Sequence, residues 1–359
     1  MPLAVYVHTP FCPSKCGYCD FNSYAMEGEI IEQTVDGIVC EILKSPYRGR
    51  PAKTIFFGGG TPTFLRAEQL ERILDAVRDV HPPIPGCEIT SEANPGTVDI
   101  PKFEAMVRAG FNRISLGAQS FQSEDLLRLG RVHAPGHIGK AVVAAREAGF
   151  RNLNLDLMFA LPGQSHRGWE KNLEFALSLR PDHLSLYCLT IEANTRFYRL
   201  WLRGMLDLPD DEAQIAMYDH AIEACAQAGL GQYEISNFAR PGMECQHNLC
   251  YWRAEEYAAY GPGAVGRVGD TRYTVAKHPN LYIQGPGAWC DSEQVEDVLA
   301  SERVMLGLRL TEGVSEDGLD VSTIKRMLER GLLDRDEGRI RLTRQGQHLA
   351  NSVISELMP

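Results

Sequence analysis

The stretch YVHTPFCPSKCGYCDF, residues 6–21, decides the fold. It places Cys12, Cys16 and Cys19 on one short loop, directly after the apolar run AVYVH at residues 4–8, which is typical of a β-strand. Three thiolates on one tight loop can converge on a single soft metal centre. We therefore expect a metal or metal-cluster site where the first strand ends.

Short runs rich in β-branched and aromatic residues recur along the chain, and each is followed by a longer helical pattern. The predicted strands are residues 4–8, 53–57, 87–91, 113–117, 152–158 and 183–189. Apolar residues at three- and four-residue spacing predict helices over 68–80, 102–110 and 139–149. This alternation predicts βαβ units and a parallel sheet, whose site lies at the carboxyl ends of the strands.

One phrase repeats: RAGFNRISL (108–116), EAGFRNLNL (147–155) and QAGLGQYEI (227–235). In each, a helix end is followed by glycine, an apolar anchor and a predicted strand. Glycine fits just past a helix because that position often needs a left-handed backbone. The phrase therefore predicts three helix-to-strand junctions.

Beyond residue 200 the pattern weakens. Residues 210–228 predict a helix, whereas 236–290 are rich in Gly, Pro and aromatics without clear periodicity. From residue 298, two helices, a hairpin strand and a last helix are similar to a winged helix. Residues 314–359 hold seven Lys and Arg against eight Asp and Glu, so we expect a packing or lid unit rather than a DNA reader.

Composition narrows the class of protein. The 359 residues include 36 Lys and Arg and 47 Asp and Glu, a net charge of −11 that argues against nonspecific nucleic-acid binding. The ten cysteines are too few for a disulfide scaffold in so long a chain, and no signal-peptide pattern or membrane-length apolar run occurs. We expect a cytoplasmic protein without stable membrane insertion.

The cysteine loop allows two metal sites. His8 with the three cysteines could bind zinc, although its place in the strand favours an ordinary hydrogen-bonded residue. A [4Fe–4S] cluster usually takes four thiolates, so three would leave one iron open to a small ligand. S-adenosylmethionine (SAM) can chelate that iron, and electron transfer then breaks a C–S bond and releases a 5′-deoxyadenosyl radical.

The CxxxCxxC loop, with an aromatic residue before its last cysteine, resembles the signature of the radical SAM superfamily. Its flanks YVHTPFC and CDFNSY resemble the branch that contains oxygen-independent coproporphyrinogen III oxidases and heme chaperones. The resemblance implies a partial (β/α)6 TIM-like barrel over residues 1–235, a connecting region over 236–297 and a winged-helix-like α+β domain over 298–359. It also implies a [4Fe–4S] cluster on the three cysteines.

The resemblance further implies a SAM site. In FFGGGTPTFL (56–65), glycines after a strand allow a ligand to approach the backbone, and the stretch is similar to the GGE-type motif that holds the methionyl amino group. Four polar residues are expected late in strands: Glu92, Gln119, Asp156 and Arg131. The implied SAM contacts are Tyr6, Tyr18, Gly59, Gly60, Thr61, Glu92, Gln119, Arg131 and Asp156. Tyr18 would lie on the adenine, the two carboxylates would accept from ribose hydroxyls or the amino group, and Arg131 would meet the carboxylate.

Two features favour the chaperone over the oxidase. Phe21 stands where the oxidase loop carries a fourth cysteine. The stretch CQHNLCYW (245–252) is similar to the HNxxYW motif of the chaperones, which implies heme contacts by His247, Asn248, Tyr251 and Trp252, since His can ligate heme iron and aromatics offer flat surface. Val265 stands where a family histidine often occurs, so His247 is the main candidate ligand.

We therefore expect a heme chaperone that binds [4Fe–4S], SAM and heme or another porphyrin, and passes heme to client proteins without oxidase activity. The alternatives are an oxygen-independent coproporphyrinogen III oxidase, another radical SAM modification enzyme and a zinc-binding structural module. The sequence leaves open whether the chain forms a homodimer, contacts a membrane peripherally or cleaves SAM productively.

Overall fold

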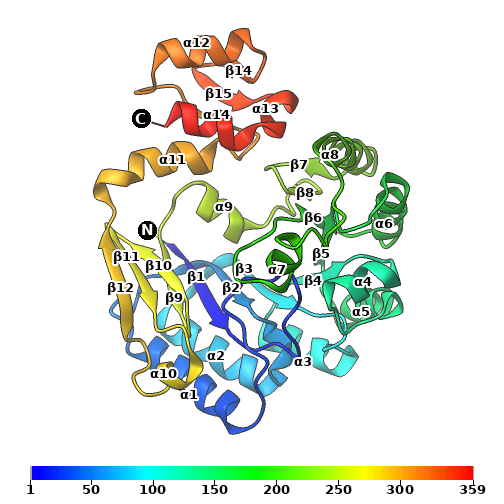
Figure 1. Cartoon of the computed structure of the whole chain (residues 1–359). Helices are drawn as coiled ribbons and strands as arrows, with labels where there is room; N and C mark the ends of the chain where they lie inside the picture. Colours follow the sequence, from blue (N-terminus) through cyan, green and yellow to red (C-terminus); the bar gives the residue numbers. More distant parts are fainter. Residues whose placement is uncertain (1, 359) are drawn as a thin grey trace.

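One large curved sheet dominates the computed structural model, which describes residues 2–358 (Figure 1). The strands follow the order β12-β11-β10-β9-β1-β2-β3-β4-β5-β6-β8-β7. The central six pair in parallel and in chain order. They are β1 (Leu3–Thr9), β2 (Ala52–Gly59), β3 (Pro83–Ala93), β4 (Arg113–Gln119), β5 (Asn152–Phe159) and β6 (His183–Cys188). All six predicted strands are confirmed.

Helices connect these strands and cover the outside of the sheet (Figure 1). They are α1 (Glu29–Leu43), the 3₁₀ turn η1 (Pro62–Phe64), α2 (Ala67–Val80), α3 (Ile100–Ala109), α4 (Ser123–Leu129), α5 (Pro135–Ala148) and α6 (His166–Ser178). Gly110 and Gly149 end α3 and α5 with φ of 103° and 108°, as the repeated phrase predicts. The third copy of the phrase also leads from a helix into a strand, but this strand is short. After α8 (Asp211–Gln227) comes only the two-residue β7 (Gly231–Gln232), on the antiparallel edge of the sheet.

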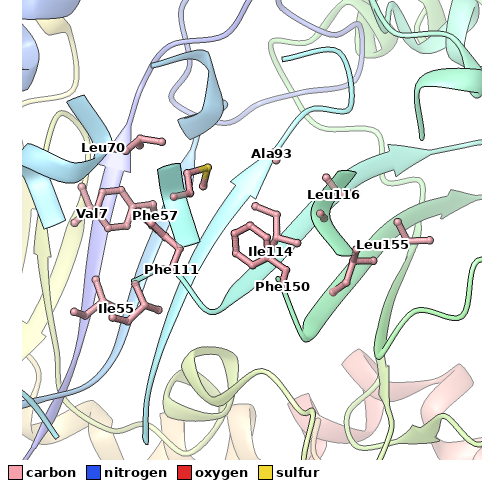
Figure 2. Packing of buried hydrophobic residues seen from close by; sticks show 14 of the residues in the cluster. Val7, Ile55, Phe57, Leu70, Ala93, Phe111, Ile114, Leu116, Phe150 and Leu155 are labelled. Carbon is pink, nitrogen blue, oxygen red and sulfur yellow. The ribbon is translucent and has the colours of Figure 1, made fainter. Parts of the chain in front are cut away.

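The two faces of the sheet differ because strand side chains alternate. Apolar residues such as Val7, Ile55 and Phe57 point outward and pack under the helices (Figure 2). Phe57 meets Phe111 edge to face, with ring centroids 5.1 Å apart. The intervening residues point inward and are largely polar, so the barrel interior can hold a site.

The region predicted without periodicity is in fact ordered. It contains β8 (Asn237–Ala239), α9 (Gln246–Trp252), β9 (Tyr257–Tyr260), β10 (Val265–Val268), β11 (Thr271–Val275), α10 (Pro279–Tyr282) and β12 (Trp289–Gln294). β9 pairs in parallel with β1, and β10, β11 and β12 extend the same sheet. The domain boundaries at residues 235 and 297 stay a prediction, although much of the predicted connecting region belongs to the large sheet.

The C-terminal unit follows the winged-helix-like pattern. It contains η2 (Glu296–Val298), α11 (Leu299–Gly307), β13 (Val314–Ser315), α12 (Val321–Glu329), β14 (Leu333–Asp336), β15 (Arg339–Leu342), α13 (Arg344–His348) and α14 (Ala350–Leu357). Its three strands form an antiparallel sheet over a small core of their own. Arg344 and His348 tie it to Asp219 of α8. Among residues 2–358, no helix combines the length and apolarity that crossing a membrane requires.

Candidate functional site

The cysteine loop lies where β1 ends. Backbone bonds hold its two ends together, from Cys12 N–H to the Tyr24 carbonyl (3.0 Å) and from Tyr24 N–H to the Pro10 carbonyl (2.7 Å). At its middle, Gly17 N–H donates to the carbonyl of Leu129 at the end of α4, and Phe197 N–H of α7 (Arg196–Trp201) donates to the Gly17 carbonyl. The loop is therefore held in place by the barrel itself.

A cavity of about 360 Å³ opens at the carboxyl ends of the strands, beside this loop. Eleven of the predicted residues line it: Cys12, Cys16, Cys19, Tyr18, Gly59, Gly60, Thr61, Glu92, Gln119, Arg131 and Asp156. The structure thus brings together residues from the cysteine loop, from β2 to β5 and from the segment after α4. A donor set of three thiols, two carboxylates and a guanidinium suits an iron–sulfur cluster with an amino-acid ligand.

The glycine run explains how β2 approaches the cysteine loop. Gly59 has φ of +106°, and a Cβ there would lie 2.4 Å from the His8 ring. A Cβ on Gly60 would lie 2.6 Å from the Phe11 carbonyl oxygen. The amides of Gly60 and Thr61 donate to the carbonyls of Thr9 and Phe11, so this turn offers carbonyl oxygens rather than amides to a ligand's amino group.

Two carboxyl groups, those of Glu92 and Asp156, line the cavity and are largely buried from solvent. Burial, together with the negative charge of Asp156, raises the pKa of Glu92 to about 8, while the Gly59 N–H (3.2 Å) opposes the shift. Burial also raises the pKa of Asp156, which accepts hydrogen bonds from Asn154 (2.7 Å) and Ser115 (3.1 Å). Because two like charges share this space, a cationic ligand would stabilise both carboxylates.

Arg131 does not lie where the sequence predicts it. It was expected late in a strand, but it follows α4 and the left-handed Gly130 in a loop. From there its guanidinium reaches the Gly117 carbonyl (2.8 Å) and Cys16 Sγ (3.5 Å), and its Nε is buried without a hydrogen-bond partner. The free N–H of Arg131 suits an anionic ligand group, whereas burial raises the pKa of the Cys12 and Cys19 thiols in the ligand-free cavity.

Tyr6 lies deeper in the barrel than the cavity lining. Its hydroxyl lies 3.0 Å from His8 Nδ1, and His8 Nε2 lies 2.8 Å from the Asn22 carbonyl oxygen. Both His8 nitrogens are therefore engaged, and burial lowers the pKa of His8 to about 4. His8 is the hydrogen-bonded strand residue that the sequence favoured, which weakens the zinc alternative.

The HNxxYW residues lie away from this cavity, at the amino ends of the strands. Helix α9 lies between the sheet and the C-terminal unit (Figure 1). His247 is buried against Thr54 near the start of β2, and its ring stacks on Phe56 with centroids 4.9 Å apart. Trp252 lies near Arg309, which follows α11, with its centroid 5.7 Å from the guanidinium carbon. The predicted heme residues are therefore separate from the SAM residues that line the cavity, although Tyr6, a predicted SAM residue outside that lining, stacks on His247 with ring centroids 6.2 Å apart.

Some cavity residues were not found from the sequence, among them Phe21, Asn94, Tyr187, Cys188 and Glu192. Tyr187 could have been found, because His183, Ser185 and Tyr187 alternate in β6 as polar residues on one face. The same alternation in β3 puts Glu88 and Thr90 beneath Glu92, and both are buried in the barrel. Asn94 and Glu192 lie in loops and carry no periodic signal.

Comparisons with known proteins agree with this geometry. Residues 6–176 match the model of the radical SAM superfamily, and residues 296–349 match the HemN C-terminal domain. The heme chaperone HemW of Bacillus subtilis is 38% identical over 99% of both chains. HemW of Escherichia coli is 43% identical over 79% of this chain and 76% of its own length. HemW of Mycobacterium tuberculosis is 38% identical over 99% of this chain and 95% of its own.

One solved structure extends the likeness to the whole fold. Coproporphyrinogen III oxidase HemN from Escherichia coli superposes with a TM-score of 0.85, covering 99% of this chain and 90% of that chain at 23% identity. At this identity the match concerns the architecture. The partial barrel with its C-terminal α+β unit is therefore confirmed.

Proposed function

The chain belongs to the HemW family of the radical SAM superfamily, and we propose that it is a heme chaperone that binds a [4Fe–4S] cluster, SAM and heme. The observation that carries the proposal is the single cavity that three thiols share with Glu92, Asp156 and Arg131. The choice of heme as the cargo rests on the full-length similarity of this chain to proteins named as heme chaperones. We further propose that the chaperone acts in the cytoplasm and passes heme to client proteins.

In this proposal, Cys12, Cys16 and Cys19 ligate the cluster, which leaves one iron for SAM. Such a cluster would supply the electron for radical chemistry on bound SAM. The chain's own residues orient the ligand: Glu92 and Asp156 accept hydrogen bonds from its donors, Arg131 meets its carboxylate, and Tyr18 covers its adenine. The remaining proposed contacts are Tyr6, Gly59, Gly60, Thr61 and Gln119.

We propose that heme binds through the motif on α9, with His247 as the iron ligand and Asn248, Tyr251 and Trp252 beside the porphyrin. Neutral imidazole is the form that ligates iron, and burial, with Arg113 and Lys53 nearby, lowers the pKa of His247 to about 3. The imidazole is therefore neutral at physiological pH.

Phe21 supports a chaperone rather than an oxidase. Its side chain is 65% exposed and lines the cavity at the position where the oxidase loop has a further cysteine. We propose that the chain does not decarboxylate coproporphyrinogen III, whether or not bound SAM is cleaved.

The direct test is an anaerobic hemin titration of the reconstituted protein, followed by transfer to an apo-hemoprotein such as apomyoglobin. We expect saturable binding with a Soret band and transfer to the acceptor. His247→Ala should shift the band and lower the affinity, whereas His166→Ala, an exposed control, should match the wild type. Identical titrations of wild type and His247→Ala would remove His247 from the site.

A further inference from the structure

Both ring nitrogens of His247 already have partners. Nδ1 lies 2.8 Å from the Thr54 hydroxyl, and Nε2 lies 3.1 Å from the Tyr251 hydroxyl one helical turn away. The residue is only 1% exposed, between the rings of Phe56 and Tyr251. Because iron binds a ring nitrogen through the lone pair or site that these hydroxyls occupy, this arrangement and iron ligation exclude each other.

The backbone of α9, like the His247 ring, is hydrogen-bonded to the barrel. The carboxylate of Glu88, on β3, accepts N–H bonds from Gln246 and His247, both at 3.1 Å, and faces Cys245 Sγ at 3.6 Å. Arg113, on β4, lies 3.9 Å from the same carboxylate and is buried with it. A buried carboxylate that satisfies the first amides of a helix fixes that helix against the barrel.

We infer that α9 is a latch: Glu88 and Thr54 hold it closed inside the amino end of the barrel, and heme reaches His247 only when this hold is released. The inference rests on the proposed function, because it concerns how heme gains access to the same histidine. In the closed state His247 is satisfied and shielded. In the open state the bond from Nδ1 to Thr54 of β2 is broken, and this ring nitrogen becomes available to iron.

A latch makes heme affinity depend on the open fraction. The apparent dissociation constant is the intrinsic one divided by the fraction of molecules that are open. Removing one hydrogen bond that exists only in the closed state therefore tightens apparent binding, by roughly two- to tenfold for an ordinary buried bond. A residue that served only to position His247 for iron would have the opposite effect.

Thr54→Val tests this with little change of shape, and the chain provides a matched control. Thr90 is also a buried threonine, on the neighbouring strand β3, but its hydroxyl has no hydrogen-bond partner. We expect Thr54→Val to bind hemin two- to tenfold faster and tighter by stopped-flow Soret absorbance, with the wild-type spectrum. Thr90→Val should match the wild type. Equal or weaker binding by Thr54→Val than by Thr90→Val would overturn the latch.

Glu88→Gln gives a second route if Thr54→Val folds poorly, since it weakens the acceptor for two amides and should also speed hemin binding. Comparison of these variants with His247→Ala separates the two claims. If His247→Ala alone leaves hemin binding unchanged, the proposed iron ligand fails. If His247→Ala weakens binding but Thr54→Val and Glu88→Gln do not strengthen it, only the latch fails.

Discussion

The two ends of the barrel place buried carboxylates in different surroundings. At the carboxyl end, Glu92 and Asp156 face an open cavity that they share with Arg131 and three free thiols. At the amino end, the carboxylate of Glu88 is matched by Arg113 and by the amides of α9. The difference indicates where ligands are expected: the carboxyl end is open, with polar side chains lining a cavity, whereas the amino end is closed, with its polar groups paired to α9.

The largest expected effect concerns the open end. Replacing Cys12, Cys16 and Cys19 together by Ala should abolish the cluster, because no other thiol lies on that loop. Anaerobically reconstituted wild type should be brown and contain about four irons per chain. Iron analysis and absorbance check this, with Cys87→Ala, a buried cysteine outside the cavity, as the control. Iron retained by the triple variant would place the cluster elsewhere.

Next in size is the turn that brings β2 under the cysteine loop. Gly59→Ala combines a left-handed backbone with a Cβ 2.4 Å from the His8 ring, so it should lower the free energy of unfolding by about 2–4 kcal/mol. Gly229, just after α8, has φ of +77°, and a Cβ there meets nothing within 4 Å. Gly229→Ala should therefore cost only about 1 kcal/mol. If chemical denaturation gave equal losses in the free energy of unfolding for the two variants, the close approach of β2 to the His8 ring would not contribute to stability.

Glu92 gives a pH-dependent test of the same end. Its folded pKa of about 8 lies above the ordinary 4.5, so between these pH values the folded chain binds more protons than the unfolded chain. The contribution of Glu92 to the free energy of unfolding should therefore fall as pH rises from about 4.5 to 8. Glu92→Gln should make the overall slope shallower without removing it, because burial also raises the pKa of Glu41 to about 7. Denaturation at pH 5, 6.5 and 8 measures it.

The same variant should weaken SAM binding roughly tenfold or more, as loss of a hydrogen bond to a charged group does. Glu104→Gln, on the exposed surface of α3, should bind SAM as the wild type does. Unchanged SAM affinity by calorimetry in Glu92→Gln would contradict a ligand role for this carboxylate.

The smallest effect belongs to the closed end. Tyr251→Phe removes the hydroxyl beside His247 Nε2 and should cost about 1 kcal/mol of stability. SAM affinity should stay unchanged, since Tyr251 does not line the cavity. A large loss of SAM affinity would show that the two ends of the barrel act as one site.

The sequence predicted the barrel well because its six central strands and their helices are strongly periodic. It also predicted many of the residues that line the cavity, since the carboxyl ends of parallel strands meet at one edge. β10 was missed because it has only four residues, and β12 was missed because WCDSEQ is largely polar and exposed along its whole length. Arg131 was misplaced because a loop arginine after a glycine gives no pattern.

The position of His247 could not be predicted, for a physical reason. The contact between His247 and Glu88 joins residues 159 apart in the chain, and nothing in HNxxYW indicates which end of the barrel it closes. In the structure, Glu88, Thr90 and Glu92 alternate along β3 and all point into the barrel, a pattern that periodicity alone could have indicated. It did not indicate that one would hold a helix and another would face a ligand.

The central claim is that this radical SAM chain handles heme rather than making its precursor. One anaerobic experiment tests it: the reconstituted protein, with SAM and a reductant, is offered hemin in one arm and coproporphyrinogen III in the other. We expect stoichiometric heme binding followed by transfer to an apo-hemoprotein, and no decarboxylated porphyrinogen. Conversion of coproporphyrinogen III, without heme binding, would contradict the account.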